Sequence, residues 1–364
     1  MANIPKAKFV ISKNKALEQY KKINEIADTV SYSSKTNPDI TPIMEDNTNC
    51  LFSVHISNEL KNIKDKSRVL FLAQAWDEEQ ISQLVGLGVF RFVVDNVSDL
   101  DVLLSFLKQS ENVGIKIELM LRSKLKENTM RTERHFVFGI PCETVNKKIL
   151  ELKNRPNISS LGIHFHRKTQ NMAEWNLCYE VSNMFSEETL QAIDVLNIGG
   201  GFPSIYANTN VDVSKSVFRR INELKVFMKE KNIFLMLEPG RFIAAPAGKL
   251  ITHITAIYEN NIVVNASVYN TDMDALIVPV KLLIENEFDK NDETVKSGKA
   301  QPYVVKGCTP CSVDLFRYRV YLKNPQVGDQ LVFVNAGAYN FASDFCDLEK
   351  LETEIVENFE NETC

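Results

Sequence analysis

The sequence lacks the features of several classes of protein. It has no run of 18 apolar residues, and its first twenty residues, MANIPKAKFVISKNKALEQY, contain no continuous apolar segment. We therefore expect neither a membrane-spanning helix nor a secretory signal. Basic residues are not in excess, since 42 Lys and Arg stand against 47 Asp and Glu for a net charge of −5. Such a balance does not favour binding to a phosphate backbone, so we expect no nucleic-acid partner.

The cysteines do not form a metal-binding or disulfide pattern. There are seven, an odd number, and Cys308 and Cys311 form a CxxC without a second pair at zinc spacing. We expect no metal site and a reduced, cytoplasmic protein whose thiols are mostly structural.

What the sequence contains is an alternation of short apolar runs with longer amphipathic ones. Hydrophobic residues make up 44% of the 364 residues, which is ample for a packed core. Strand-like runs alternate with helical runs about eight times, and one of the helices is expected to begin at Ser57 as N-cap. This order demands right-handed βαβ crossovers and predicts an α/β protein with a (β/α)₈ barrel over residues 15–245. An open, doubly wound sheet is the alternative. The strand-like runs are 29–34, 50–56, 67–73, 90–95, 115–122, 159–166, 193–201 and 233–242.

The pattern changes after about residue 246. Short β-rich runs broken by Asn, Gly and Pro follow, and helical periodicity is weak. We expect a smaller all-β domain over 246–364, completed by a strand within residues 1–14. The acidic tail from residue 348 is expected to fray.

Candidate chemistry stands where the barrel strands end, because the active sites of such barrels lie at the carboxyl ends of the strands. Lys35 follows a strand expected to be buried, where desolvation would lower its pKa and allow it to form a Schiff base with an aldehyde. The alternative is a lysine whose stem is buried and whose amine reaches solvent. The other residues at strand ends are Arg122, His166, Gly199, Gly200, Gly201, Glu238, Gly240 and Arg241.

Each of these residues also has a purely structural interpretation. Three adjacent glycines can form an anion-binding nest of backbone N–H groups, or simply a tight turn. Glu238 could hold a protonated ring nitrogen, or pair with Arg241. One of His164 and His166 could stack on an aromatic cofactor, or be a hydrogen-bonded core residue. Taken together, an imine-forming lysine, a phosphate cradle, a carboxylate and a stacking imidazole are what pyridoxal phosphate requires.

Six motifs, in order and spacing, resemble those of the fold-type III pyridoxal-phosphate decarboxylases, a family with an alanine-racemase-like barrel. The family includes ornithine, diaminopimelate, arginine and carboxynorspermidine decarboxylases. The resemblance covers nearly the whole chain, and its most specific motifs are LNIGGGFP and LEPGRF. The other four are SYSSKTN, LGIHFH, GCTPCSVD and NAGAYNFA.

The resemblance implies a role for each candidate. Lys35 would carry the cofactor aldehyde, and Glu238 would pair with the pyridine nitrogen. The active sites would be shared between the subunits of a homodimer, with a cysteine from the partner as the proton donor. The remaining cofactor contacts would come from His166 stacking on the ring, from Arg122 near the ring oxygen, and from Thr169, Gly199, Gly200, Gly201, Gly240, Arg241 and Tyr339.

The chain departs from the family pattern near the implied substrate. In GCTPCSVD an ungapped match puts Pro310 in the cysteine's place, so the thiol is Cys311 after a one-residue shift, which we favour, or Cys308. The acid that usually grips a distal substrate amine is missing there, and Asp314 matches another position. Candidate substrate residues are therefore Cys308, Asp314, Asp272 and Asp274, the last two in a segment where Val278 replaces an aspartate of the ornithine enzymes.

Other departures from the family pattern remove negative charge or add positive charge. Ser53 stands in place of an acid, and Arg167 and Lys168 add positive charge after the stacking histidine. These changes favour a substrate with a negative or bulky distal end. The resemblance leaves several hypotheses open. The first is α-decarboxylation of a conjugated amino acid, such as a siderophore intermediate or the carboxylated aminopropyl group of a peptide-nucleotide antibiotic. The second is decarboxylation of ornithine, lysine, arginine or diaminopimelate. The others are an inactive, decarboxylase-like regulator and an amino-acid racemase.

Overall fold

The computed structural model describes residues 4–124, 138–166, 176–209, 214–340 and 343–359. The chain forms two compact units. One consists of Tyr20–Pro203 and Val213–Gly240, and the other of Met1–Gln19, Ser204–Asp212 and Arg241–Cys364. We call them the barrel unit and the sheet unit.

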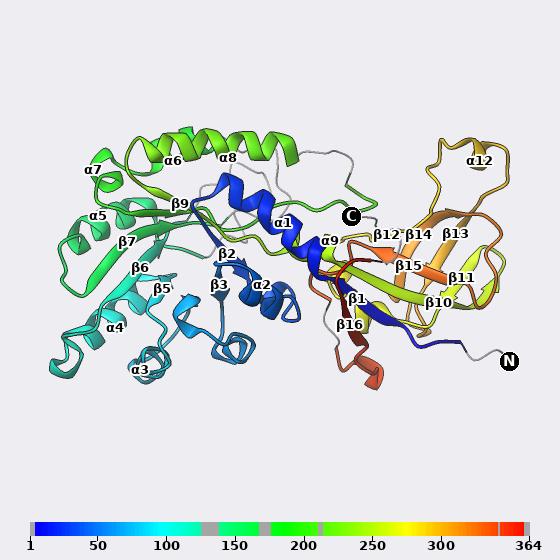
Figure 1. The fold of residues 1–364 in the computed structure, drawn as a ribbon, viewed down its shortest axis with the longest axis horizontal. Helices are drawn as coiled ribbons and strands as arrows, with labels where there is room; N and C mark the ends of the chain where they lie inside the picture. Colours follow the sequence, from blue (N-terminus) through cyan, green and yellow to red (C-terminus); the bar gives the residue numbers. More distant parts are fainter. Residues whose placement is uncertain (1–3, 125–137, 167–175, 210–213, 341–342, 360–364) are drawn as a thin grey trace. The chain divides into compact units, whose positions relative to one another are not determined.

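The barrel unit is built on a closed sheet of eight parallel strands (Figure 1). Neighbouring strands in the chain are neighbours in the sheet, and the pairing of Val30 with Leu237 joins the last strand to the first. The closed sheet confirms the predicted (β/α)₈ barrel and excludes an open doubly wound sheet. The strands are β2 (Thr29–Ser33), β3 (Leu51–Val54), β4 (Val69–Ala73), β5 (Arg91–Val94), β6 (Ile117–Arg122), β7 (Ile158–His164), β8 (Val195–Asn197) and β9 (Phe234–Leu237).

Helices follow the strands and lie outside them (Figure 1). Several begin at a capping side chain: Asp77 accepts a hydrogen bond from the Gln80 backbone, and Asn96 accepts one from the Asp99 backbone. In the described part of the chain, no helix has the length and apolar character needed to cross a bilayer. The elements are η1 (Ser34–Thr36), α2 (Thr41–Asn47), η2 (Ser57–Asn62), η3 (Lys66–Arg68), α3 (Glu78–Gly86), α4 (Val97–Lys108), η4 (Ser110–Asn112), α5 (Cys142–Leu152), α6 (Leu177–Met184), α7 (Glu187–Leu190) and α8 (Ser214–Lys229).

The helix expected from Ser57 is a correction. The segment Ser57–Asn62 is a 3₁₀ helix, and its N-cap is Ile56. Glu59 accepts hydrogen bonds from the backbone N–H groups of His55 and Ile56 at 2.9 and 3.2 Å, which tightens this turn. Leu60 is its only buried residue, so the segment has no apolar stripe that would support an α-helix.

The sheet unit contains an eight-stranded sheet with the order β12-β15-β10-β11-β13-β14, and β1 joins β10 to β16. Residue 246 lies within the short helix α9, after which the chain enters the long strand β10. The smaller β domain is therefore as predicted in class. Its strands are β1 (Lys8–Ser12), β10 (Gly248–Tyr258), β11 (Asn261–Val264), β12 (Leu283–Ile284), β13 (Gln301–Lys306), β14 (Leu315–Leu322), β15 (Gln330–Val334) and β16 (Glu352–Val356). Its short helices are α9 (Arg241–Ala247), α10 (Val268–Thr271), α11 (Asp274–Ile277), α12 (Glu293–Lys296) and η5 (Phe345–Asp347), and α1 (Lys13–Ile26) follows β1.

The acidic tail differs from its prediction. Instead of fraying, Glu352–Val356 forms β16, which pairs in parallel with β1. Lys8 on β1 forms an ion pair with Glu354 at 2.6 Å, and the Glu357 carbonyl accepts a hydrogen bond from the Asn14 backbone. The acidic residues of this segment thus meet a lysine on a neighbouring strand, a long-range contact that composition alone does not reveal.

A layer of apolar side chains from four strands fills part of the barrel interior. Leu70, Val93, Met120 and Met236 are buried and pack against one another, and Leu51, Leu72 and Val195 cover them. Because interiors are close-packed, a cavity in this layer is costly.

We predict that Leu70→Ala lowers the free energy of unfolding by about 2–5 kcal/mol, since it removes buried methyl groups and leaves a cavity. Urea unfolding measures the loss. Val226→Ala is the matched control, because Val226 is 60% exposed, and its effect should stay within about 0.5 kcal/mol. Equal effects of the two substitutions would contradict this description of the core.

Candidate active site

Seven of the candidate residues lie at the ends of five strands of the barrel. Lys35 follows β2, Arg122 ends β6, His166 follows β7, the three glycines follow β8, and Glu238 follows β9. Since all eight strands are parallel, their carboxyl ends meet at one end of the barrel.

Lys35 lies in the 3₁₀ turn η1, directly after β2. Its side chain is exposed, yet neighbouring protein atoms remove enough water to lower the pKa of its amine. Glu238 and Glu59 act in the opposite direction, and Arg122 adds to the lowering of the pKa. The amine is therefore easier to deprotonate than an ordinary lysine, as its reaction with an aldehyde requires.

Glu238 is a buried, charged carboxylate. Asn197 donates a hydrogen bond to its Oε1 at 2.7 Å, and His164 Nε2 lies 3.6 Å from the same oxygen. Burial on its own would raise the pKa of Glu238, but His164 and Asn197 outweigh it and lower the pKa to about 2. The carboxylate can therefore serve as an anionic partner for a cationic ring nitrogen at neutral pH.

The glycines after β8 form a tightly packed turn. Gly199 has φ +68°, and a Cβ there would lie 2.6 Å from the Phe165 carbonyl oxygen; a Cβ on Gly200 would lie equally close to the Glu238 carbonyl oxygen. The Gly199 N–H donates to Asn197 Oδ1 at 2.9 Å, and the Gly200 N–H donates to His166 Nδ1 at 3.2 Å. Two of the three N–H groups expected to cradle an anion are therefore bonded within the protein. Among the described residues, Gly201 N–H has no such acceptor.

His166 is half-buried and holds the glycine turn through this hydrogen bond. Burial and the neighbouring His164 lower the pKa of His166 to about 3, so the ring is neutral. A neutral imidazole whose Nδ1 is fixed in this way has a defined ring orientation.

Arg122 forms an ion pair with Asp95, with Nη1 2.9 Å from Oδ1, and its guanidinium lies 5.1 Å from the centre of the Phe138 ring. Asp95 directly follows β5. Asp95 could have been identified from the sequence, because it stands at a strand end like the other candidates.

His55 is a further residue that the sequence analysis missed. It follows β3, and β2 pairs with β3 so that Ser33 faces Ser53, which puts Lys35 and His55 each two residues beyond a facing pair. Burial, followed by the charge of Lys35, lowers the pKa of His55 to about 3. Its Nδ1 lies 3.8 Å from Glu59 and has no hydrogen-bond partner in the part of the chain that the structure describes.

Gly240 allows two segments of the barrel unit to approach closely. A Cβ at this position would collide with Thr36 Oγ1 in the turn that carries Lys35, and would lie 3.2 Å from the Ser33 Cβ. Gly240 thus fits a packing role. Thr169, Arg167 and Lys168 lie outside the described residues.

In the sheet unit, Arg241 begins α9 and is buried. Its Nη1 donates to the Tyr206 hydroxyl at 2.9 Å and forms an ion pair with Asp274. Its guanidinium lies 4.8 Å from the Tyr339 ring centre. Burial opposes the charge, but Tyr206 and Asp274 raise the pKa of Arg241. Its Nε is buried and has no partner among residues whose structure is described. One edge of a fixed cation is thus available to an anion.

Asp272 and Asp274, the candidate substrate residues, differ in state. Asp274 is committed to Arg241. Asp272 is 1% exposed, and within the described ranges its Oδ2 has no hydrogen-bond partner. Burial and the neighbouring Asp274 raise the pKa of Asp272 well above its usual value, so this carboxyl favours the protonated form.

The two candidate thiols also differ. Cys311 Sγ lies 3.0 Å from the Tyr269 hydroxyl, whereas Cys308 is exposed. Asp314 is buried, and its carboxylate accepts hydrogen bonds from Val268 and Thr309, so it holds the loop together. Its role in binding substrate stays a prediction.

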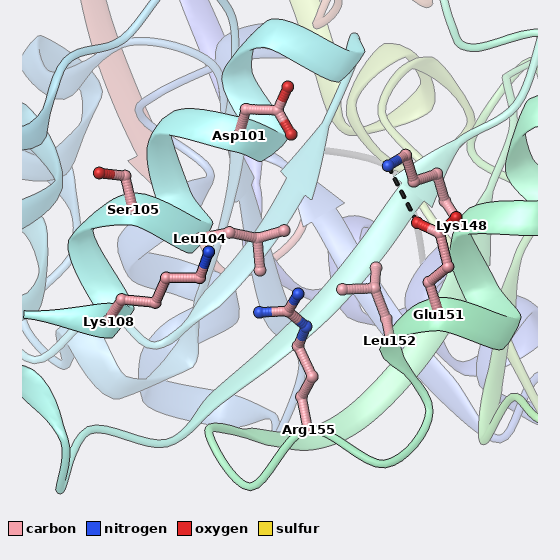
Figure 2. Close-up of a pocket in the computed structure, with 8 residues that line it drawn as sticks. All are labelled: Asp101, Leu104, Ser105, Lys108, Lys148, Glu151, Leu152 and Arg155. Carbon is pink, nitrogen blue, oxygen red and sulfur yellow. Dashed lines mark hydrogen bonds and ion pairs between the residues drawn. The ribbon is translucent and has the colours of Figure 1, made fainter.

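A cavity of about 390 Å³ lies elsewhere, on helices α4 and α5 (Figure 2). Its lining comes from helix side chains and the residue Arg155 that follows them, with none from a strand end, and Lys148 pairs with Glu151 at 3.0 Å. It is therefore separate from the residues described above. The lining residues are Asp101, Leu104, Ser105, Lys108, Lys148, Glu151, Leu152 and Arg155.

We predict that Glu238→Gln makes stability less sensitive to acid. Ionisation of Glu238 stabilises the folded chain above its unfolded-state pKa of 4.5, and this contribution is lost as pH falls through the folded pKa of about 2. At neutral pH the contribution is on the order of 3 kcal/mol. Urea unfolding at a series of pH values should show the difference between the two proteins shrinking in acid. A difference independent of pH would contradict the assignment; exposed Glu223→Gln is the control.

We further predict that Asp274→Ala destabilises the protein by about 3–5 kcal/mol, because it leaves the Arg241 cation buried and unpaired. Replacing both partners together, Arg241→Met with Asp274→Leu, should cost much less. Denaturant midpoints of the single and double variants test this, and additive losses would be inconsistent with a buried pair.

Curated relatives align with this chain over most of its length. A Staphylococcus aureus protein named 2-[(L-alanin-3-ylcarbamoyl)methyl]-2-hydroxybutanedioate decarboxylase is 26% identical over 301 residues, covering 77% of this chain and 74% of the relative. A diaminopimelate decarboxylase of Archaeoglobus fulgidus is 26% identical over 300 residues, covering 76% and 68%. Antizyme inhibitor 2 of Xenopus laevis is 23% identical over 303 residues, covering 76% and 62%.

Solved structures share the fold. The lysine decarboxylase of Selenomonas ruminantium superposes with a TM-score of 0.79 at 20% identity, covering 98% of this chain and 94% of that one. The family model described as the pyridoxal-binding domain of pyridoxal-dependent decarboxylases matches residues 12–245. This match spans more than half of the chain and confirms the predicted family. The chain belongs to the pyridoxal-dependent decarboxylases, enzymes that release carbon dioxide with the help of pyridoxal phosphate.

Proposed function

We propose that this enzyme removes the α-carboxylate of an L-amino-acid centre within a conjugated molecule whose distal end is anionic or bulky. The observation that carries the proposal is that two residues at the carboxyl ends of barrel strands both have shifted pKa values. The pKa of the Lys35 amine is lowered, and the pKa of the Glu238 carboxyl is about 2. Glu238 is within electrostatic reach of Lys35.

The residues fit pyridoxal phosphate. Bound there, the cofactor supplies an aldehyde that joins an amine and a ring that accepts the electron pair left when carbon dioxide departs. Lys35 is the amine that would hold the aldehyde, and Glu238 the anion that would face the ring nitrogen. In the sheet unit, Arg241 Nε is a buried donor without a hydrogen-bond partner among the described residues.

The chain's own residues then have separable tasks. Lys35 would hold the cofactor aldehyde and yield it to the substrate amine, a role that requires an amine able to lose and regain its proton. His166, neutral and held by the Gly200 N–H, presents a fixed ring face. Asn197 binds Glu238 and the Gly199 N–H at once, so it keeps the carboxylate and the glycine turn in register.

The distal end of the substrate is inferred from what the chain offers it. Asp274 is neutralised by Arg241, and Asp272 favours its protonated form, so neither presents a free negative charge to a diamine-forming substrate. The name of the Staphylococcus aureus relative describes an alanine unit joined through a carbamoyl group to a hydroxybutanedioate, which carries carboxylates. We propose a substrate of this kind in preference to ornithine, lysine, arginine or diaminopimelate.

We also propose that the active enzyme is a homodimer in which the GCTPCSVD segment of one subunit serves the active site of the other. Cys308 and Val313 of this segment are exposed, so the segment is accessible to a second subunit. Light scattering of the purified protein measures the size directly, and a monomer at working concentrations would refute this arrangement.

An inactive regulator is the second candidate, and two observations favour it. Antizyme inhibitor 2 is among the relatives, and Pro310 occupies the ungapped place of the family cysteine. Retention of Lys35 and an ionised Glu238 favours the enzyme.

The test uses the full chain loaded with pyridoxal phosphate and a panel of amino acids and their carboxylated conjugates, with carbon dioxide release as readout. We expect a visible absorption band that borohydride abolishes, and turnover of a conjugate. Lys35→Ala should lose the band and roughly a thousandfold or more in turnover, because the amine that holds the aldehyde is gone.

Lys61→Ala, at an exposed lysine of the same unit, is the control and should leave both readouts unchanged. A band without release from any substrate would favour the regulator. Absence of the band in the wild type would refute the enzyme, and release from ornithine or lysine alone would refute the proposed distal end.

A further inference from the structure

Tyr269 and Cys311 make a direct polar contact in the sheet unit. The Tyr269 hydroxyl lies 3.0 Å from Cys311 Sγ, a distance at which either atom could donate a hydrogen bond. Tyr269 is 8% exposed, Cys311 is half-buried, and Cys308 is exposed. Among the described residues, Cys311 has a phenol as a partner and Cys308 does not.

Asp314 fixes the distance between the two segments that carry this contact. Its Oδ1 accepts a hydrogen bond from the Val268 N–H at 2.9 Å, at the start of the helix that holds Tyr269. Its Oδ2 accepts from the N–H and the hydroxyl of Thr309 at 3.0 and 2.6 Å, in the loop that leads to Cys311. One buried carboxylate thus joins both segments. Gly307 lies against it so closely that a Cβ would collide with the carboxylate.

The tyrosine itself is held on three sides. A reciprocal cap formed by Ser267 and Asn270 begins its helix, and the Ser343 N–H donates to its carbonyl oxygen at 2.9 Å. The Tyr269 ring stacks on Phe345 with ring centres 4.0 Å apart. The hydroxyl therefore approaches Cys311 from a fixed direction, as a group that positions another side chain must.

The contact affects the two acids in opposite directions. The hydrogen bond from Tyr269 lowers the pKa of Cys311, while the same bond raises the pKa of Tyr269 to about 12. The phenol therefore remains protonated and can donate to a thiolate. Burial instead raises the pKa of Cys308. A thiolate is consequently easier to form and to stabilise at 311 than at 308.

We propose that Tyr269 is a positioning residue for proton donation, and that Cys311 together with Tyr269, rather than Cys308, forms the proton-donor pair of this enzyme. The inference rests on the proposed decarboxylation. The S–H bond of Cys311 breaks and a C–H bond forms on the substrate carbon, whose electron pair was left by the departing carbon dioxide. Tyr269 donates its hydrogen bond to the resulting thiolate, and a proton from water restores the thiol before the next turnover.

The first test needs no substrate. The full-length protein with cofactor is alkylated with iodoacetamide across a pH series, and the modified Cys308 and Cys311 peptides are quantified by mass spectrometry. In the wild type, we expect the midpoint of Cys311 alkylation to lie below that of Cys308. Tyr269→Phe keeps the ring on Phe345 but removes the hydroxyl, and should raise the Cys311 midpoint by roughly one pH unit while leaving that of Cys308 in place.

Tyr258→Phe is the matched control, because Tyr258 also carries a hydrogen-bonded hydroxyl in the sheet unit, accepting from Lys306 at 2.6 Å. It should move neither midpoint. A Cys311 midpoint that is unchanged by Tyr269→Phe, or that moves equally in the control, would overturn the proposal.

The second test follows turnover. Tyr269→Phe should lower kcat roughly tenfold with little change in KM and shift the pH profile of kcat. In a Cys311→Ala background, already slowed, the same substitution should have no further effect, and Cys308→Ala should be mild. Additive losses, or a severe effect at Cys308, would reject the pair. If no substrate turned over but the alkylation midpoints behaved as expected, the Tyr269–Cys311 contact would stand and the proposed decarboxylation would fall.

Discussion

Burial of the Glu238 charge is the constraint on which the candidate site of the barrel depends. A carboxylate removed from water is unstable unless nearby groups compensate it, and here Asn197 and His164 do so strongly enough to lower its pKa to about 2. Glu238 in turn favours the charged form of Lys35, whereas desolvation favours the neutral amine. The lysine is thus held between two opposing influences. A lysine in a stronger ion pair would stay protonated. A buried lysine without an anionic neighbour would have nothing to stabilise its charged form.

The sheet unit places charge differently. Arg241 and Asp274 are both buried, and their mutual attraction replaces the water each has lost. Because this pair uses Asp274 internally, and because Asp272 beside it favours protonation, two acids in one segment contribute little net charge toward a ligand. The number of acidic residues in this segment is therefore a poor guide to the charge that a ligand would meet. Their partners decide whether a distal amine meets an anion, and here the partner is a cation of the same unit.

The period of the hydrophobic pattern made the architecture predictable, because parallel strands buried on both faces read as apolar runs separated by amphipathic helices. The barrel and the β domain followed from it. The turn after Ser57 did not, since its conformation depends on Glu59 bonding to two backbone N–H groups. Strand β16 was missed because it needs β1, some 340 residues away, as a partner. In the site, Lys35, Glu238 and the glycines stood out as strand ends. Asn197 ends β8 but was not singled out, because its importance lies in bonding both Glu238 and the Gly199 N–H.

The cysteine segment shows why pairing matters more than position in a motif. An ungapped match with the family puts a proline where the thiol should be, which suggests lost activity if only the motif is considered. The folded chain fixes the loop through Asp314, which bonds both Thr309 and the helix of Tyr269. That carboxylate sets where Cys311 lies, so a thiol displaced by one residue in sequence still has a definite partner in space. A cysteine can therefore stand one residue away from its place in a motif and still have a defined environment, provided that the residue anchoring the loop does not shift with it.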